Sequence, residues 1–245
     1  MLRNDFVRII RIWSQTLLPP VVTTSLYFIV FGAFIGSQIA PIDGFSYMQF
    51  IVPGLIMMSV ITSSYMNTVS TFYFAKWTKT LDEILVSPMP DWLVILGFVS
   101  GGVLRGLLVG LLVAIVALFF THLAIFNLVV LVLAVVLTSL LFSIAGLING
   151  VFAKGFDGIS IVPTFVLTPL TYLGGIFYSV QMLPEFWQKV SLFNPILYMV
   201  NAFRWGFLGI SDIPLSTCFA VLGGITVILL AVTGYLFRNG IGLKN

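Results

Sequence analysis

The stretch that decides the fold is AKWTKTLDEILVSPMPDW, residues 75–92, which separates two long apolar segments. The whole chain has 245 residues, of which 60% are hydrophobic and 8% charged, and its mean hydropathy is +1.15. Soluble domains carry about 25% charged residues, so this chain needs the lipid bilayer as its solvent. Five of the 19 charged residues nevertheless gather in this one stretch: Lys76, Lys79, Asp82, Glu83 and Asp91.

The middle of this stretch, residues 81–86, predicts a short helix with its own start and stop signals. Thr80 and Glu83 have the spacing of a capping box, and Pro88 and Pro90 prevent the helix from continuing. Its apolar residues share one face, because they recur at i, i+3 and i+4: Leu81, Ile84 and Leu85. The pattern favours a helix that docks onto something outside the membrane over a loop that merely connects two spans.

Six apolar runs predict six membrane-spanning helices, since about 20 residues cross roughly 30 Å of hydrocarbon. We therefore expect an all-α, polytopic membrane protein whose residues 1–245 form a single domain, with no room for a soluble ATPase domain. The predicted spans lie near residues 17–36, 48–74, 93–120, 125–152, 159–179 and 215–237.

The positions of the basic residues predict the orientation, because cytoplasmic loops are enriched in Lys and Arg. With both termini in the cytoplasm, two basic residues lie outside, Lys189 and Arg204. Eight then lie inside: Arg3, Arg8, Arg11, Lys76, Lys79, Lys154, Arg238 and Lys244.

The N-terminal residues 1–20 predict an amphipathic helix that lies in the membrane interface. Phe6, Ile10, Trp13 and Leu17 fall on one helical face, whereas the basic residues point toward anionic headgroups. We assign Arg3, Arg8, Arg11 and Trp13 to this interfacial helix. A signal peptide is the competing interpretation, but no convincing small-residue cleavage site follows.

The segment before the last span is too apolar for a free loop and too interrupted for a span. Pro184 and the pair Asn194-Pro195 are helix start signals, and Gly209 is a stop signal. They predict two short helices, 184–192 and 195–208, re-entrant or lying on the outer face.

The sequence contains no motif for covalent, metal or ATP chemistry. The phosphate-binding pattern GxxxxGK[ST] is absent, and a single histidine, His122, and a single cysteine, Cys218, exclude a multi-residue metal site. The small net charge of +3 is spread along the chain, so nucleic acid is not an expected partner. We expect a chain that is no enzyme and binds no metal or cofactor of its own.

Arg105 is the exception, because it lies about a dozen residues into the third predicted span. An ion at that depth is costly and must face a polar cavity or a partner. Direct contact with a substrate and structural pairing with backbone carbonyls both stay open.

Four stretches in this order resemble the ABC-2 type permease family, the membrane subunits of ABC exporters. They are FSYMQFIVPGLIMMSVI (45–61), TLDEILVSPMPDW (80–92), PTFVLTPLTYLGGIFYSVQMLP (163–184) and FNPILYMVNAFRWGFLG (193–209). The resemblance covers nearly the whole chain and looks closest to a small permease of the bacterial inner membrane.

The resemblance implies a homodimer that encloses a substrate path, with one ATP-binding subunit under each copy. ATP and Mg then belong to the partner subunits, and the helix 81–86 transmits their motion. The residues implied in coupling are Lys79, Leu81, Asp82, Glu83, Ile84, Leu85 and Pro88. Those considered for a substrate path or gate are Arg105, Tyr172, Phe177 and Arg204, although the aromatic residues fit a lipid-facing surface better.

Two other classes stay open at this point. A secondary transporter or channel without ATP coupling would show inverted repeats with broken midplane helices, and none is evident. A membrane-embedded enzyme would need several His, Asp, Glu or Ser residues at one depth. The transported substrate does not follow from the sequence.

Overall fold

The computed structural model describes residues 7–8, 10–42, 44–122 and 124–243. The regular structure of these residues is helical, apart from an isolated bridge between Ile42 and Phe45. The all-α prediction is therefore confirmed. Five helical stretches of the described chain are long and apolar enough to cross a membrane: Trp13–Gly32, Tyr47–Trp77, Asp91–Ala117, Leu128–Phe152 and Leu215–Arg238.

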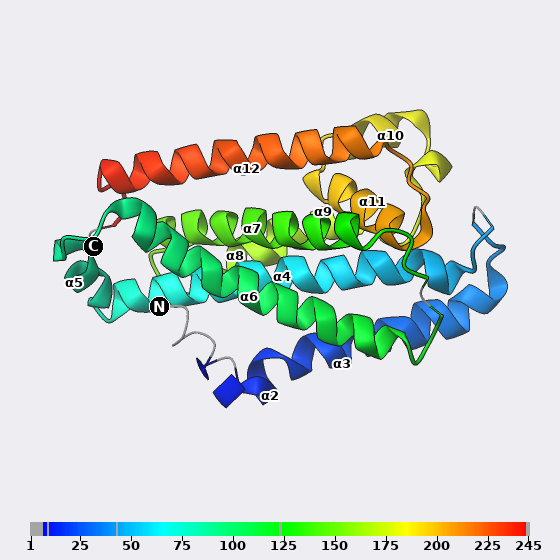
Figure 1. The fold of residues 1–245 in the computed structure, drawn as a ribbon, viewed down its shortest axis with the longest axis horizontal. Coiled ribbons are helices and arrows are strands. Elements are labelled where there is room, and N and C mark those ends of the chain that lie inside the picture. The colour runs from blue at the N-terminus through cyan, green and yellow to red at the C-terminus, as the bar shows by residue number, and fades with distance from the viewer. Residues whose placement is uncertain (1–6, 9, 43, 123, 244–245) are drawn as a thin grey trace.

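The long helix α4 (Tyr47–Trp77) forms the centre of the bundle (Figure 1). It starts with a capping box. The Ser46 hydroxyl accepts from the Gln49 backbone amide, and the Gln49 side chain accepts from the Ser46 backbone amide. Most of its side chains are buried. Its longer neighbours include α3 (Leu18–Tyr27), α6 (Asp91–Ala117), α7 (Leu128–Phe152) and α11 (Pro195–Leu208).

The chain enters this bundle through a helix of mixed geometry. The short α2 (Trp13–Thr16) leads through Leu17 into α3, which continues as a π-helix, η1 (Phe28–Ile35), and a 3-10 turn, η2 (Gly36–Gln38). The last long helix, α12 (Leu215–Arg238), packs on α7 and α11.

The predicted fifth span differs from the structure. Residues 156–172 are helical, but the predicted end at residue 179 is wrong, because Gly175 turns the chain at a φ of +70°. Seventeen residues rise about 26 Å, slightly less than the hydrocarbon thickness. The stretch consists of α8 (Phe156–Val162), the π-helix η3 (Pro163–Leu167) and α9 (Thr168–Tyr172).

The two short helices before the last span are confirmed as helices. After the turn η4 (Val180–Met182), α10 covers Glu185–Ser191 and α11 covers Pro195–Leu208. The Asn194 side chain accepts a hydrogen bond from the Ile196 amide, and Gly209 ends α11 at a φ of +74°. The start and stop signals therefore act as the sequence predicts.

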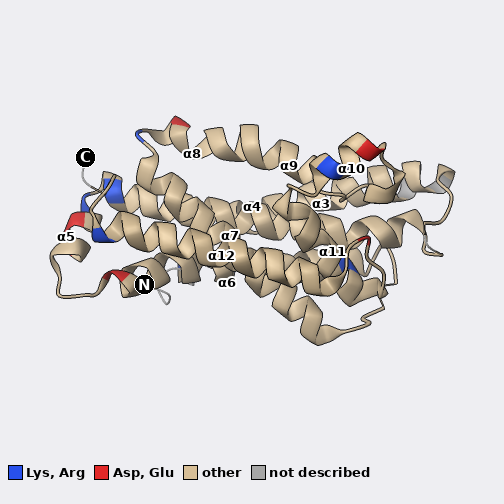
Figure 2. Cartoon of the chain, turned by 90° about the horizontal axis from the view of Figure 1, so that it is seen from above, with Lys and Arg blue, Asp and Glu red and all other residues tan. Residues whose placement is uncertain are grey.

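Charged residues gather at the two ends of the bundle (Figure 2). One group surrounds the short helix α5 (Thr80–Val86), near the end of α12, and the other surrounds α10 and α11. The long middle part of the bundle is nearly free of charge in this view, as expected for a surface in contact with lipid.

Candidate functional site: a docking end and an arginine-lined face

The short helix α5 begins differently from the sequence prediction. Its N-cap is Lys79, which adopts the left-handed conformation at a φ of +61°, and no side chain caps the helix. The predicted capping box is wrong, because Thr80 is already helical and its hydroxyl lies 3.0 Å from the Thr78 hydroxyl. Asp82 and Glu83 do lie in the first turn, where the helix dipole favours anions.

The apolar face of α5 is covered by the chain's own helices. Leu81 is fully buried, in a cluster with residues of α6 and α12 that include Phe98 and Phe237, and Ile84 and Leu85 pack against the same cluster. The expectation that Leu81 would fill a groove on another protein is therefore corrected, whereas Ile84 and Leu85 are only half-buried and their contact with a partner stays a prediction.

The outward face of α5 belongs to other residues. Asp82 and Glu83 are exposed, and the Val86 side chain is 87% exposed at the end of the helix. Beyond it, Pro88 and Trp92 are exposed as well. This face is the part of α5 that a partner can reach.

Lys76 anchors the same end of the bundle. Its Nζ donates to the carbonyl oxygens of Val151 at 3.1 Å and of Gly242 at 2.8 Å, and its side chain is buried. Lys76 thereby joins the last turns of α4 and α7 to the segment after α12, and it is no free loop charge as the sequence suggested.

Arg8 also differs from its predicted position toward lipid headgroups. Its Nη2 donates to the Thr71 hydroxyl at 2.6 Å and to the Asn67 side-chain oxygen at 3.5 Å, so the guanidinium points at α4. Arg11 and Trp13 are exposed, whereas Arg3 lies outside the described residues.

Arg105 occupies a notch between α3, α4 and α6. Its Nη2 donates to the Thr16 carbonyl at 3.1 Å, which Pro20, four residues later, cannot bond because it lacks an N–H. The Arg105 side chain also lines two surface cavities of about 340 and 420 Å³. Arg105 therefore bonds a backbone carbonyl and also lines cavities, and its contact with a substrate stays a prediction.

The two cavities beside Arg105 are lined by a row of polar residues on α4 that the sequence analysis missed. Its residues are spaced by four and share one helical face: Ser59, Ser63, Asn67 and Thr71. This spacing inside an apolar span is the signal that would have found them.

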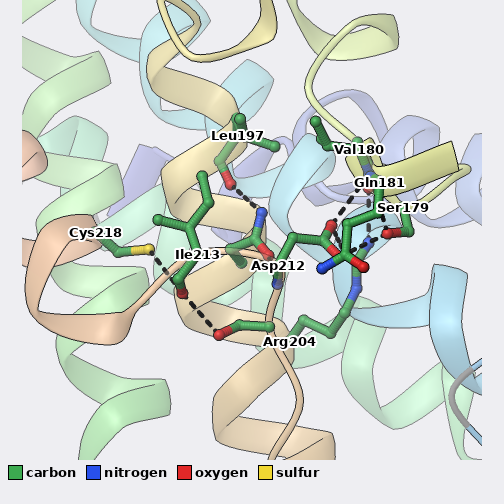
Figure 3. Close-up of polar contacts among 11 residues, drawn as sticks. Ser179, Val180, Gln181, Leu197, Arg204, Asp212, Ile213 and Cys218 are labelled. Carbon is green, nitrogen blue, oxygen red and sulfur yellow. Dashed lines mark hydrogen bonds and ion pairs between the residues drawn. The ribbon is translucent and has the colours of Figure 1, made fainter. Parts of the chain in front are cut away.

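Arg204, near the C-terminal end of α11, is 1% exposed and lies in a polar network (Figure 3). Its Nη2 donates to the Gly175 carbonyl at 2.7 Å, and its Nη1 lies 3.9 Å from Asp212 Oδ2. Its Cζ lies 3.8 Å from the ring centroid of Phe50, a cation–π distance. In this conformation Arg204 ties elements together and lines no open path.

The aromatic candidates form one cluster near the end of α9. Tyr172 stacks on Phe177 at a centroid distance of 5.9 Å, and its hydroxyl lies 3.3 Å from the Tyr27 hydroxyl. Tyr172 is 42% exposed, so this cluster presents an aromatic surface beside the cavity of about 340 Å³, which Tyr27 lines. Among the described residues, no group of three or more His, Cys, Asp or Glu side chains stands ready for a metal ion.

Comparison with known proteins agrees with this architecture. The chain is 57% identical to the inner membrane transport permease YadH of Escherichia coli K12 over 242 residues, which are 99% of this chain and 94% of YadH. It is 24% identical to nodulation protein J of Rhizobium leguminosarum bv. viciae over 185 residues, 75% of this chain and 71% of that protein. The sequence model of the ABC-2 type transporter family matches residues 1–208, and the chain therefore belongs to this family.

Proposed function

We propose that this chain is the membrane subunit of an ATP-driven exporter, working as a homodimer with one ATP-binding subunit under each copy. The membership in the ABC-2 family and the likeness to an inner membrane transport permease support a transport role. The helix α5 carries the coupling part of this proposal, because one face is anchored in the bundle while the other is open.

The construction of α5 suits the transmission of force. It follows α4 after two residues and precedes α6 by four, so both long helices move when α5 moves. The burial of Leu81 makes α5 part of the rigid bundle end, which a flexible loop is not. We assign the contact with the ATP-binding subunit to Asp82, Glu83 and Val86, with Lys79 and Pro88 at its margins.

The substrate path, in this proposal, runs along the open face of α4 between α3 and α8. The two cavities and Arg105 line this face, and a second copy of the chain would cover it. The exposed Tyr172 and the half-buried Phe177 would border the path toward the end of α11.

In the membrane, we propose six crossings with both termini in the cytoplasm. The helical run 156–172 serves as the fifth crossing, and the N-terminal residues lie in the inner interface, where exposed Arg11 and Trp13 suit headgroups. The prediction is that Asn245→Cys, in intact cells, resists a membrane-impermeant thiol reagent. Labelling of this position from outside would contradict the orientation.

The experiment that tests the coupling role changes only the exposed face of α5. In Glu83→Lys/Val86→Glu permease, we expect loss of the ATP-binding subunit in a pull-down from membranes, while the permease still inserts and dimerises. The matched control, Glu185→Lys/Phe186→Glu, changes an acidic and an exposed apolar residue on α10 at the opposite end. Full binding and ATP turnover in the α5 variant would show that α5 only connects two spans.

A further inference from the structure

The two cavities beside Arg105 have a mostly apolar lining into which a few polar side chains are set. The upper one, of about 340 Å³, contains Ser63 and Thr62 of α4, and the lower one, of about 420 Å³, contains Asn67, Thr71 and Arg8. Arg105 is the residue that lines both.

Three buried hydrogen-bond donors without an acceptor belong to residues that line these cavities. Arg105 Nε, Asn67 Nδ2 and Ser63 Oγ are buried and make no hydrogen bond within the described part of the chain. Asn67 and Ser63 are each 3% exposed. Asn67 Oδ1 accepts from Arg8, so the Nδ2 group is the part of this amide that still lacks a partner. Such donors are costly to leave unbonded, and each of them fits an acceptor.

The charges around the lower cavity also favour a ligand that accepts hydrogen bonds. Two guanidinium groups, those of Arg8 and Arg105, lie in its wall, and none of the described residues that line it is a carboxylate. Much of its remaining wall is apolar, with Ile12, Phe74 and Ile159 among the lining residues. In a low-dielectric site, positive charge favours an anion strongly.

We propose that these cavities form a binding site for a phosphate-type oxyanion, held by Arg105, Asn67 and Ser63 with Arg8 close by. The proposal names the chemical class of ligand that would enter the path proposed above. Binding of the anion does not depend on that path, but a role of the bound anion in transport rests on the proposed function. A guanidinium fork and neutral donors suit phosphate oxygens, which accept several hydrogen bonds at once.

The position of the site suits a ligand that enters from the α5 end. Asn67 lies ten residues before the end of α4 at Trp77, a rise of about 15 Å. Two sources of phosphate fit, the headgroup of a lipid with its chains along the apolar wall, or a water-soluble phosphate ester.

Binding to the purified full-length permease tests the site without the ATP-binding subunit. One arm measures ³²P-labelled orthophosphate by equilibrium dialysis in neutral detergent. The other measures retention of phosphatidylglycerol against uncharged diacylglycerol, by mass spectrometry, after extraction from mixed vesicles. Saturable binding in the first arm alone indicates a soluble ligand, whereas retention in the second indicates a lipid headgroup. The absence of binding in both arms overturns the proposal.

Asn67→Asp is the decisive variant, because it replaces a donor by a negative acceptor of the same shape. The new carboxylate also offers Arg8 and Arg105 a partner, so the variant should fold. We expect binding at least about tenfold weaker, while Asn239→Asp, the same charge change at the end of α12, binds as wild type. Unchanged binding in Asn67→Asp overturns the site.

Ser63→Ala gives an independent measurement should Asn67→Asp fail to fold. It removes one donor and little volume, and we expect several-fold weaker binding with unchanged thermal unfolding. Equal binding by Ser63→Ala and wild type then rejects the site. The pull-down of the ATP-binding subunit is separate, so failure of anion binding with an intact pull-down rejects this site alone. Loss of the proposed coupling with intact anion binding rejects only the proposed function.

Discussion

Two arginines inside the bundle, Arg204 and Arg105, are held in opposite ways. Arg204 is 1% exposed and meets a carboxylate, a carbonyl and an aromatic ring. Arg105 donates to the Thr16 carbonyl and lines two cavities.

The charge of Arg204 is balanced by the Asp212 carboxylate, whereas the charge of Arg105 lies beside cavities that a ligand could occupy. The carboxylate beside Arg204 has further partners, since Asp212 also accepts from the Ser179 hydroxyl at 2.6 Å and the Val180 amide at 3.1 Å. Buried networks of this kind hold elements in place, and their removal costs stability. An arginine with a cavity beside it is the arrangement that a ligand can use.

The largest expected effect comes from Asp212→Ala, which leaves the Arg204 guanidinium buried without its carboxylate. We expect unfolding to become easier by about 3–5 kcal/mol, measured by thermal unfolding in detergent. Asp157→Ala, at an exposed acid on α8, is the control and should change little. A stability equal to wild type would show that the pair is not the support we describe.

Replacement of both partners, Arg204→Met with Asp212→Leu, should recover more than half of that loss. Removing a buried ion pair as a unit leaves no unpaired charge, although the Val180 amide loses its acceptor. The same unfolding measurement on the double variant tests this. A double variant less stable than Asp212→Ala would mean that Arg204 is held mainly by Phe50 and Gly175.

Arg105→Leu should affect function far more than stability. We expect unfolding to change by at most about 1 kcal/mol, while the ATP turnover of the assembled transporter loses its dependence on substrate. Arg105→Lys, which keeps the charge but loses the planar fork, should retain part of the activity. Parent-like turnover in Arg105→Leu would place Arg105 with Arg204 as a structural residue.

The smallest effect is expected from Pro20→Ala. The new N–H at position 20 can donate to the Thr16 carbonyl and so compete with Arg105. We expect a stability change below about 1 kcal/mol and slow hydrogen exchange at the amide of position 20. Fast exchange there would show that Arg105 still holds the carbonyl.

The sequence predicts well those parts of the fold that local chemistry determines. The bounds of α11 follow from Asn194-Pro195 and Gly209, because a cap, a proline and a left-handed glycine act within a few residues. Five long apolar helices follow from composition alone.

Features that depend on tertiary contacts escape a reading of the sequence. One such feature is the burial of Leu81 in a cluster to which α4, α6, α7 and α12 contribute, and another is the left-handed conformation of Lys79. The direction of Arg8 depends on the distant Thr71. Arg105 is recognisable from its depth in an apolar span, but its cavities are formed by α3 and α4 and cannot be inferred from α6.

The bonds of Lys76 have a mechanical consequence. A single ammonium group joins the ends of α4 and α7 to the chain after α12 through two carbonyls, so these three ends behave as one block. A force applied to α5 would then tilt α4 and α7 as rigid helices, and the chain would not simply bend at residue 78. For the same reason, a protein truncated before Gly242 should lose stiffness at the bundle end even though every long helix remains.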